Sequence, residues 1–347
     1  MKVLILQNSI LHYRIPIYNL LSDACNLTVS YSIKLENEDQ CNFNIIYLPV
    51  KRLLGGLYWH QCNIRKISEE YDVTIVLGDM HWLKFMKLIF FNNSKIIVWG
   101  MEASTAKGYK IVNKFILLRL LFMSKADALL HYSDYPIRQY VKMGIPRNKQ
   151  FVAFNTVKVS NQNLDKERNI ILFIGSIHPR KGLDILLKAY KLVNEDIELP
   201  ELYIVGSGPD SNKLIDWVVN NGLEKKVKMC GAVYDINKKS RIFSKTIACI
   251  SPCQAGLTVL ESMGYGVPFV TSRNAITSGE LFNIKNGENG VLMDSLSDLE
   301  MILKDINMHP EKYLEMGKRA KHYYDTFRTP INMVNGFVEA INYAINK

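Results

Sequence analysis

The stretch 251–271 constrains the fold more than any other part of the chain. Residues 246–250, just before it, are β-branched and apolar, as in a buried parallel strand. Within the stretch, Leu257, Leu260 and Met263 recur at helical spacing, and glycines and a proline end the helix before a second apolar run. The pattern predicts a strand, a tight turn, a short helix and another strand, which is the repeating unit of a parallel sheet.

The predicted turn contains Ala255, Gly256 and Leu257, followed by a single acid, Glu261, about one turn into the helix. N–H groups in the first turn of a helix have no intrahelical partner, so such a turn can bind an anion. A carboxylate one turn further can accept both hydroxyls of a ribose attached to the same phosphate. We interpret the unit as a nucleotide diphosphate site. The alternative is an ordinary strand–helix–strand unit in which Glu261 is a solvated surface acid.

A second loop, 175–182, follows the apolar strand 170–174 and carries the adjacent cations Arg180 and Lys181. Cations beside glycines at the carboxyl end of a strand suit a diphosphate, although loop cations are often simply solvated. P-loop spacing is absent, and Gly206-Ser207-Gly208 lacks the third glycine of a dinucleotide fingerprint. A dehydrogenase is therefore disfavoured.

With 347 residues, the chain is long enough for two α/β domains. Strands and helices alternate in both halves, which predicts two Rossmann-like, doubly wound parallel sheets with ligands in the cleft between the domains. We place the domains at 1–160 and 161–329, joined by a polar linker within 155–169, and expect a C-terminal helix at about 330–347 to pack back on the first domain.

The alternation predicts the following elements. We expect strands over 3–7, 27–33, 43–48, 73–77, 95–99, 128–131, 151–154, 170–174, 202–205, 227–230, 246–250, 269–271 and 291–293. We expect helices over 15–24, 58–71, 82–91, 111–123, 135–143, 183–192, 213–221, 257–263 and 310–346, the last one broken near Thr329.

Charge is distributed unevenly. Residues 1–160 carry 20 Lys and Arg against 11 Asp and Glu, a net of +9, whereas the remainder is nearly neutral. A basic domain suggests an anionic partner such as a membrane surface, and no nucleic-acid motif accompanies it. The apolar run 115–123 is too short to span a bilayer and is interrupted by Arg119, so we expect it to be core and the protein to be cytoplasmic. The six cysteines show no zinc or redox spacing, and we expect no metal.

Four motifs, in order, resemble the second domain of retaining GT-B glycosyltransferases of family 4. They are Phe173-Ile174-Gly175 with Arg180-Lys181-Gly182, then Ile204 to Pro209, then Gly256-Leu257 to Glu261 with Gly266-Val267-Pro268, and finally Asn286 to Leu292. Together they cover about half of the chain. The resemblance implies a GT-B fold and a nucleotide-sugar donor, with no cofactor besides that substrate.

The resemblance also implies roles for individual residues. Glu261 corresponds to the ribose-binding glutamate and Lys181 to the lysine that contacts the diphosphate. The other residues expected at the donor are Gly175, Ser176, Gly206, Cys253, Ala255, Gly256 and Leu257, together with Gly231, Ala232 and Val233, against which the base packs. Retention of configuration, with the leaving phosphate as the base, agrees with the lack of a visible nucleophile motif.

The chain also departs from the family pattern. Cys253 replaces the first signature glutamate, which touches the donor sugar, so the sugar is left open. Ser176 replaces an arginine, which makes Arg180 a candidate substitute. Glu102 stands where the family often has a histidine, and we expect it to be either catalytic or a plain loop acid. The loop His12-Tyr13-Arg14 is a candidate acceptor contact, although for His12 a structural role is favoured.

The sequence thus predicts a glycosyltransferase that moves a sugar, with a UDP-sugar favoured as donor, to a polysaccharide or lipid-linked acceptor of a bacterial surface glycan such as lipopolysaccharide. Peripheral binding to the inner face of the plasma membrane is a further expectation. One alternative is a nucleotide-sugar epimerase or hydrolase of the same fold. Another is a non-catalytic GT-B subunit, because a signature glutamate is missing.

Overall fold

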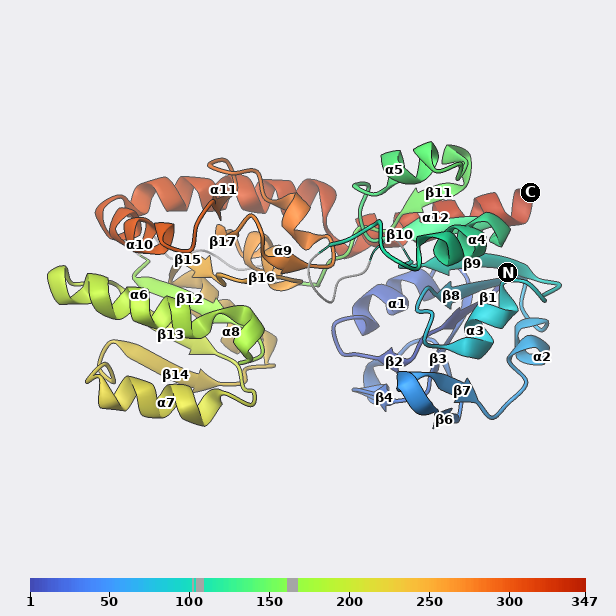
Figure 1. The fold of residues 1–347 in the computed structure, drawn as a ribbon, viewed down its shortest axis with the longest axis horizontal. Coiled ribbons are helices and arrows are strands. Elements are labelled where there is room, and N and C mark those ends of the chain that lie inside the picture. Colours follow the sequence, from blue (N-terminus) through green and yellow to red (C-terminus); the bar gives the residue numbers. More distant parts are fainter. Residues whose placement is uncertain (102, 104–108, 161–167) are drawn as a thin grey trace. The chain divides into compact units, whose positions relative to one another are not determined.

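The chain folds into two compact units, which we describe separately (Figure 1). The structure, a computed structural model, describes residues 1–101, 103, 109–160 and 168–347. Unit 1 comprises Met1–Ser104, Lys110–Lys158 and Thr329–Lys347, and unit 2 comprises Thr105–Tyr109 and Val159–Arg328.

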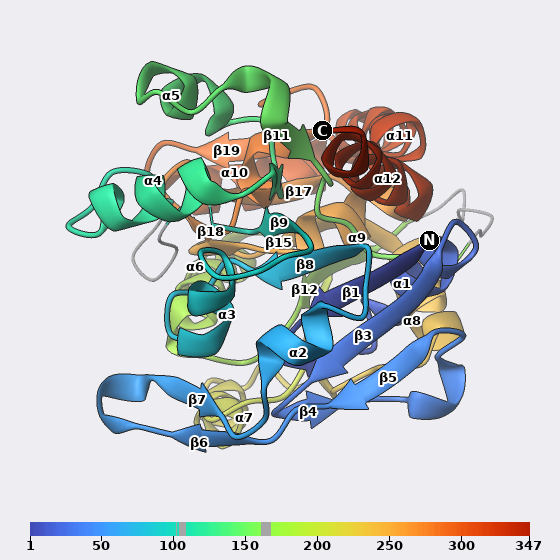
Figure 2. The same ribbon diagram turned by 90° about the vertical axis from the view of Figure 1, so that its right-hand side faces the viewer.

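Unit 1 is built on a seven-stranded sheet in the order β11-β10-β9-β8-β1-β3-β5, in which all strand pairs are parallel. Figure 2 shows strands β5, β3, β1 and β8 side by side in this order. The strands are β1 (Lys2–Leu6), β3 (Asn26–Tyr31), β5 (Asn44–Tyr47), β8 (Val73–Leu77), β9 (Lys95–Trp99), β10 (Ala128–His131) and β11 (Gln150–Val152). Short pairs flank the sheet, namely β2 (Ser9–Ile10) with β4 (Lys34–Leu35) and β6 (Val50–Arg52) with β7 (Tyr58–His60).

Helices cover both faces of this sheet. On one face, α1 (Ile15–Ser22) and the C-terminal helix α12 (Pro330–Asn346) pack together on β1, β8, β9 and β10. On the other face, α2 (Ile64–Ser68) contacts β8, where Ser68 Oγ lies 2.8 Å from Thr74 Oγ1. The remaining helices of unit 1 are α3 (Leu83–Leu88), α4 (Ile116–Lys125) and α5 (Ile137–Lys142).

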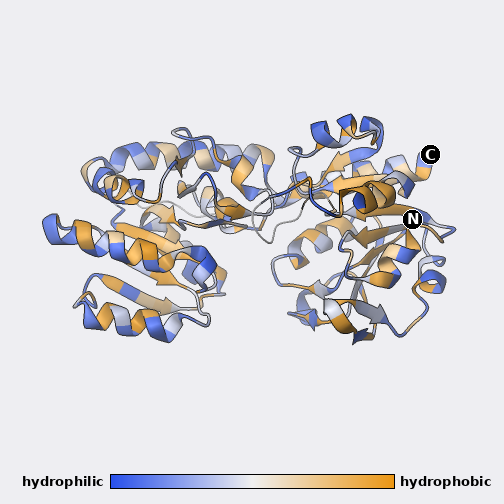
Figure 3. Ribbon diagram, in the orientation of Figure 1, coloured by the Kyte–Doolittle hydropathy of each residue, from blue (hydrophilic) through white to orange (hydrophobic). Residues whose placement is uncertain are grey.

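Unit 2 repeats the architecture with a six-stranded parallel sheet in the order β14-β13-β12-β15-β17-β19. Its strands are apolar and its outer helices are amphipathic (Figure 3). The strands are β12 (Ile170–Ile174), β13 (Glu201–Val205), β14 (Val227–Gly231), β15 (Thr246–Ile250), β17 (Phe269–Ser272) and β19 (Gly290–Met293). The helices are α6 (Leu183–Asp196), α7 (Ser211–Asn220), α8 (Ile236–Ser244), α9 (Thr258–Gly264), α10 (Asp298–Met308) and α11 (Pro310–Phe327).

The predicted pair of doubly wound parallel sheets is therefore confirmed, and so is the helix break at Thr329, which caps α12. Two helix predictions were wrong. The segment 58–71 is strand β7 followed by the short helix α2, because Tyr58, Trp59 and His60 pair with β6 instead of continuing a helix. Helix α4 begins only at Ile116.

The prediction that the run 115–123 is core was also wrong. Leu117 is 79% exposed and Leu121 46% exposed, whereas Arg119, in the middle of the run, is buried. The Arg119 guanidinium donates a hydrogen bond to the carbonyl oxygen of Ile111 at 2.7 Å, so the run 115–123 turns its one cation inward, whereas Leu117, Leu118 and Leu121 are exposed.

Candidate active site

The loops predicted to bind the donor meet at one edge of the unit 2 sheet. Because β14, β13, β12 and β15 are neighbouring parallel strands, their carboxyl ends share that edge. Backbone hydrogen bonds tie the strand ends together, from Gly175 N to Val205 O at 2.9 Å and from Gly206 N to Gly231 O at 2.8 Å. The glycines that the sequence singles out thus stand side by side, although they are far apart along the chain.

Gly206 is required by a close backbone approach. Its φ is +150°, and a Cβ at this position would lie 1.8 Å from the carbonyl oxygen of Gly175. No side chain fits there, so the β12 and β13 loops can approach each other only because residue 206 is a glycine. This contact brings the two loops to the rim of a common site.

Lys181 is the buried cation of this edge. It lies in a short 3-10 turn (Pro179–Lys181), is 7% exposed, and its Nζ lies 3.3 Å from where a Cβ on Gly175 would be. Burial lowers the pKa of the Lys181 ammonium below its ordinary value, and the nearby Glu280 carboxylate opposes that shift. Among the described residues, no ion pair or hydrogen bond engages Lys181 Nζ. Its charge is therefore available to an anionic ligand.

Glu280 is a buried acid near Lys181 that sequence reasoning missed. It is 3% exposed and accepts a hydrogen bond from the backbone N–H of Ser278 at 3.0 Å. An acid in a loop carries no sequence signal of burial, so only the packing identifies it.

The turn at Cys253 is fastened to the Lys181 loop. Cys253 N donates to the carbonyl oxygen of Lys181 at 3.2 Å, and a Cβ on Gly182 would lie 2.6 Å from Cys253 Sγ. Cys253 therefore fills the place beside the left-handed Gly182, whose φ is +70°. Burial raises the pKa of the Cys253 thiol.

Glu261 lies in the first turn of α9, as predicted, but it is not free. Lys239 of α8 donates to its Oε1 at 2.8 Å, and the two side chains are 18% (Lys239) and 14% (Glu261) exposed. Lys239 was not a predicted site residue, because no motif marks a cation on that helix. The ion pair holds the carboxylate in one place, where it is already largely desolvated.

Thr258, the first residue of α9, is a second residue that the sequence analysis missed. Its Oγ1 is buried without a hydrogen-bond partner among the described residues, and its methyl carbon lies 3.9 Å from where a Cβ on Gly175 would be. A buried hydroxyl without a partner is costly in the free protein. Its position between Gly175 and the start of α9 makes it a candidate ligand contact.

The other predicted donor residues differ in exposure. Arg180, Ser176, Gly231 and Ala232 are exposed, whereas Val233, Gly256 and Leu257 are partly buried. Ala255 is fully buried in β16 (Gln254–Ala255), which pairs with β18 (Ile276–Thr277). Their roles in binding stay predictions.

In unit 1, the predicted acceptor loop has internal partners. His12 Nδ1 lies 2.8 Å from Glu36 Oε2. Although burial raises the pKa of Glu36, hydrogen bonds from the His12 backbone and from Lys34 hold it at about 2. Arg14 is buried, donates to Asn155 Oδ1 at 2.7 Å, and its guanidinium carbon lies 5.3 Å from the centroid of the Trp99 ring. These contacts occupy His12 and Arg14, and Tyr13 lies between them. Glu102 is outside the described residues.

Metal-binding clusters and membrane-spanning helices are both absent from the described residues. No group of three or more His, Cys, Asp or Glu side chains there is arranged to hold a metal ion. No helix in that part of the chain combines the length and the apolar character that crossing a bilayer requires.

The carboxyl edge of the unit 2 sheet can neutralise and orient a phosphorylated ligand. It combines a buried ammonium that has no bonded partner in the described part of the chain, the first turn of α9 and a fixed carboxylate within that turn. Such preorganised groups stabilise charge that develops on a leaving diphosphate.

Comparisons with known proteins point to the same chemistry. Residues 155–323 match the family model described as glycosyl transferases group 1. An uncharacterized glycosyltransferase of Haemophilus influenzae is 23% identical over 272 residues, covering 74% of this chain and 73% of that protein. A phosphatidyl-myo-inositol mannosyltransferase of Mycobacterium leprae is 30% identical over 165 residues, covering 45% of this chain and 42% of that protein.

The fold is similar to that of solved glycosyltransferase structures. The crystal structure of HepE of Anabaena in complex with UDP has a TM-score of 0.74 at 15% identity and covers 99% of this chain and 100% of that one. The fold is therefore GT-B. With a glycosyl transferases group 1 domain over residues 155–323, the protein is an enzyme, a glycosyltransferase.

Proposed function

We propose that the enzyme takes its sugar from a UDP-sugar held at the carboxyl edge of the unit 2 sheet. The diphosphate lies against Lys181 and the first turn of α9, and the ribose hydroxyls donate to Glu261. The observation that carries this proposal is that Lys181 is 7% exposed, has no bonded carboxylate among the described residues, and lies at the same sheet edge as the positioned Glu261. The UDP bound to HepE, a protein of similar fold, supports the choice of nucleotide.

The proposed reaction proceeds with retention of configuration. The bond between the anomeric carbon and the diphosphate oxygen breaks, the acceptor hydroxyl oxygen attacks from the same face, and its proton passes to the leaving diphosphate. Lys181, assisted by Arg180 at the rim, neutralises the charge that develops on the diphosphate, so we propose that no metal or other cofactor takes part. Cys253 occupies the place from which a family glutamate would contact the sugar.

We further propose that the acceptor is a lipid-linked intermediate or polysaccharide of a cell-surface glycan, used at the inner face of the plasma membrane. Unit 1 contains most of the net positive charge of the chain. It also exposes apolar side chains on and just before α4, which we call the α4 stripe: Val112, Phe115, Leu117, Leu118 and Leu121. Lys114 and Lys125 flank the stripe. Exposed leucines beside lysines fit the interface of an anionic membrane.

The name of the Mycobacterium leprae relative, a phosphatidyl-myo-inositol mannosyltransferase, supports a lipid acceptor. We propose lipopolysaccharide or another surface polysaccharide as the end product.

The donor is tested with a panel of UDP- and GDP-sugars, measuring nucleotide release with and without membrane-extracted lipid acceptors. We expect one UDP-sugar to release UDP only when an acceptor is present. Release that needs no acceptor would instead indicate a hydrolase or epimerase. Calorimetry that detects no binding of UDP would refute the donor assignment.

The membrane proposal is tested by sedimentation with liposomes that contain phosphatidylglycerol, at low and moderate salt. We expect binding that weakens with salt and is lost when Leu117 and Leu121 are both replaced by serine. Leu192→Ser, at a leucine of unit 2 that is 51% exposed, is the matched control and should bind normally. A wild-type protein that stays in the supernatant at both salt concentrations contradicts the proposal.

A further inference from the structure

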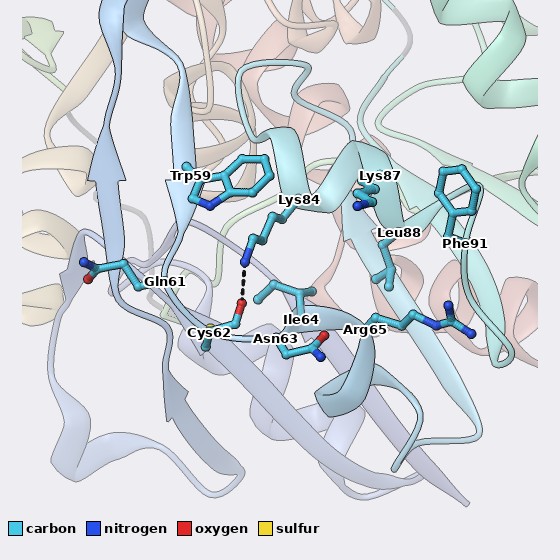
Figure 4. A pocket seen from close by; sticks show the side chains of 10 residues that line it. All are labelled: Trp59, Gln61, Cys62, Asn63, Ile64, Arg65, Lys84, Lys87, Leu88 and Phe91. Atoms are coloured by element: carbon cyan, nitrogen blue, oxygen red, sulfur yellow. Dashed lines mark hydrogen bonds between the residues drawn. The ribbon is translucent and has the colours of Figure 1, made fainter.

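Unit 1 contains a cavity of about 650 Å³ between β7, α2 and α3, for which neither the sequence motifs nor the proposed donor site accounts (Figure 4). Its volume is within the range of pockets that hold small ligands. The lining combines two exposed aromatic rings with cationic side chains, and no carboxylate is among the residues that line it.

The two aromatic side chains stand at opposite ends of the cavity. Trp59 of β7 is 41% exposed and Phe91, just beyond α3, is 58% exposed (Figure 4). Between them, Ile64 and Leu88 form an apolar floor. Large exposed aromatic rings facing a cavity are surfaces on which a ligand can stack.

The cations lie between the rings. Lys84 Nζ donates to the carbonyl oxygen of Cys62 at 2.8 Å and lies 4.9 Å from the centroid of the Trp59 ring. Lys87 follows three residues later on the same helix face, which places the two lysines roughly 4.5 Å apart along the α3 axis. Arg65 is bonded to Glu69 at 2.9 Å, but among the described residues neither Lys84 nor Lys87 has an acidic partner. The middle of the cavity therefore favours an anion with more than one charged oxygen.

The two ends of the cavity differ in their position relative to the unit 1 sheet. Tyr58 N donates to the carbonyl oxygen of His81 at 2.8 Å, which ties β7 to the loop after β8 and places the Trp59 end near the carboxyl edge of the unit 1 sheet. Helix α3 runs back from that edge, so the Phe91 end lies away from it. Phe90, the neighbour of Phe91, packs its ring 5.3 Å from Phe122 of α4. The hydrophobic end of the cavity therefore adjoins the helix that carries the α4 stripe.

We propose that this cavity binds the sugar–diphosphate–lipid part of a lipid-linked acceptor. A sugar ring stacks on Trp59, the diphosphate contacts Lys84 and Lys87, and the first part of the hydrocarbon chain lies against Phe91. The order of sugar, anion and hydrocarbon matches the order of indole, lysines and phenyl ring along the cavity. This inference rests on the proposed function, because it specifies the acceptor class proposed above.

The test titrates the intact protein with farnesyl diphosphate, farnesol, and farnesyl diphosphate carrying one glucose, each with and without UDP. Binding is followed by calorimetry and by tryptophan fluorescence. We expect farnesyl diphosphate to bind better than farnesol by at least roughly tenfold, independently of UDP, and the glucose to increase the affinity further. Lys87→Gln should remove most of the preference for the diphosphate, and Trp59→Leu should remove the gain from glucose.

Lys142→Gln, at an exposed lysine of α5 in the same unit, is the matched control and should bind like the wild type. Lys87→Arg should restore the preference for the diphosphate, and thermal unfolding confirms that each variant is folded. Four results would overturn the inference: equal binding of farnesol, competition by UDP, an equal loss with Lys142→Gln, or tighter binding of phosphatidylglycerol vesicles at the same residues. If acceptor-dependent UDP release continues while the cavity variants have no effect, only this inference fails; if UDP does not bind, the proposed function fails instead.

Discussion

Replacing Glu261 by glutamine tests the donor site most directly, because the structure gives this carboxylate a fixed position before any ligand binds. The 2.8 Å bond from Lys239 and the 14% exposure of Glu261 mean that the side chain is already ordered and largely desolvated. Binding of a ribose therefore adds hydroxyl-to-carboxylate hydrogen bonds without the full cost of dehydrating the acid.

We expect the Glu261→Gln substitution to weaken UDP binding by about 1–3 kcal/mol, or roughly 5- to 150-fold in Kd. The assay is calorimetry with two ligands, UDP and 2′,3′-dideoxyuridine diphosphate. If Glu261 accepts the ribose hydroxyls, the substitution should cost little with the dideoxy ligand, because that ligand has no hydroxyls to donate.

The comparison of the two ligands separates a ribose contact from general damage to the site. Lys239→Gln serves as the control for loss of the ion pair, and urea unfolding measures what each variant loses in stability. An equal loss of affinity for both ligands would refute the assigned role of Glu261, since the substitution would then act through the protein and not through the ribose.

Three further predictions follow from single contacts. Lys181→Gln should lower kcat for acceptor-dependent UDP release by roughly 100-fold or more, because it removes the cation that neutralises the leaving diphosphate. Lys188→Gln, on the exposed face of α6, is the control and should leave kcat unchanged. Equal rates in the two variants would contradict the role given to Lys181. Burial and the nearby Lys84 charge lower the pKa of the fully buried His60 from 6.5 to about 4. The free energy of unfolding should therefore fall by roughly 3 kcal/mol as the pH drops from 6.5 to about 4, because only the unfolded state binds the proton in this range. Urea unfolding at a series of acid pH values measures this fall, and His60→Phe should remove it. Gly206→Ala should destabilise the protein by more than about 3 kcal/mol because its Cβ meets a backbone oxygen at 1.8 Å, whereas Gly256→Ala, with open space around it, should cost less than about 1 kcal/mol by the same measurement.

The motifs of the second half of the chain were sufficient to predict the architecture there. Apolar runs that each end in a glycine-containing turn specify parallel strands, and parallel strands place their carboxyl ends at one edge. For this reason the sequence alone predicts that Gly175, Gly206 and Gly231 meet, and their backbone hydrogen bonds agree. Lys181 and Glu261 follow from the same reasoning, because each lies at a fixed distance along the chain from such a strand end.

Hydrophobic periodicity alone gave wrong predictions for two segments, because each pattern is compatible with two different structures. The segment 58–71 has enough apolar residues for a helix, but pairing with β6 makes its start a strand and turns Trp59 toward a cavity. The leucines around Arg119 resemble a buried helix, and only the packed structure shows that the arginine faces inward and the leucines outward. Hydropathy measures how apolar a segment is and not which side of it is covered.

The sequence by itself determined the two parallel sheets, the glycines at their edges and the two charged residues of the proposed donor site, because these depend on short-range pattern and spacing. Only the tertiary structure decided that Lys239 holds Glu261, that Glu280 lies buried near Lys181 and that a cationic cavity opens between α2 and α3. Each of these joins side chains from segments with no common motif. Their contacts are fixed by how the helices pack on the sheets, and motifs and short-range periodicity do not predict that packing.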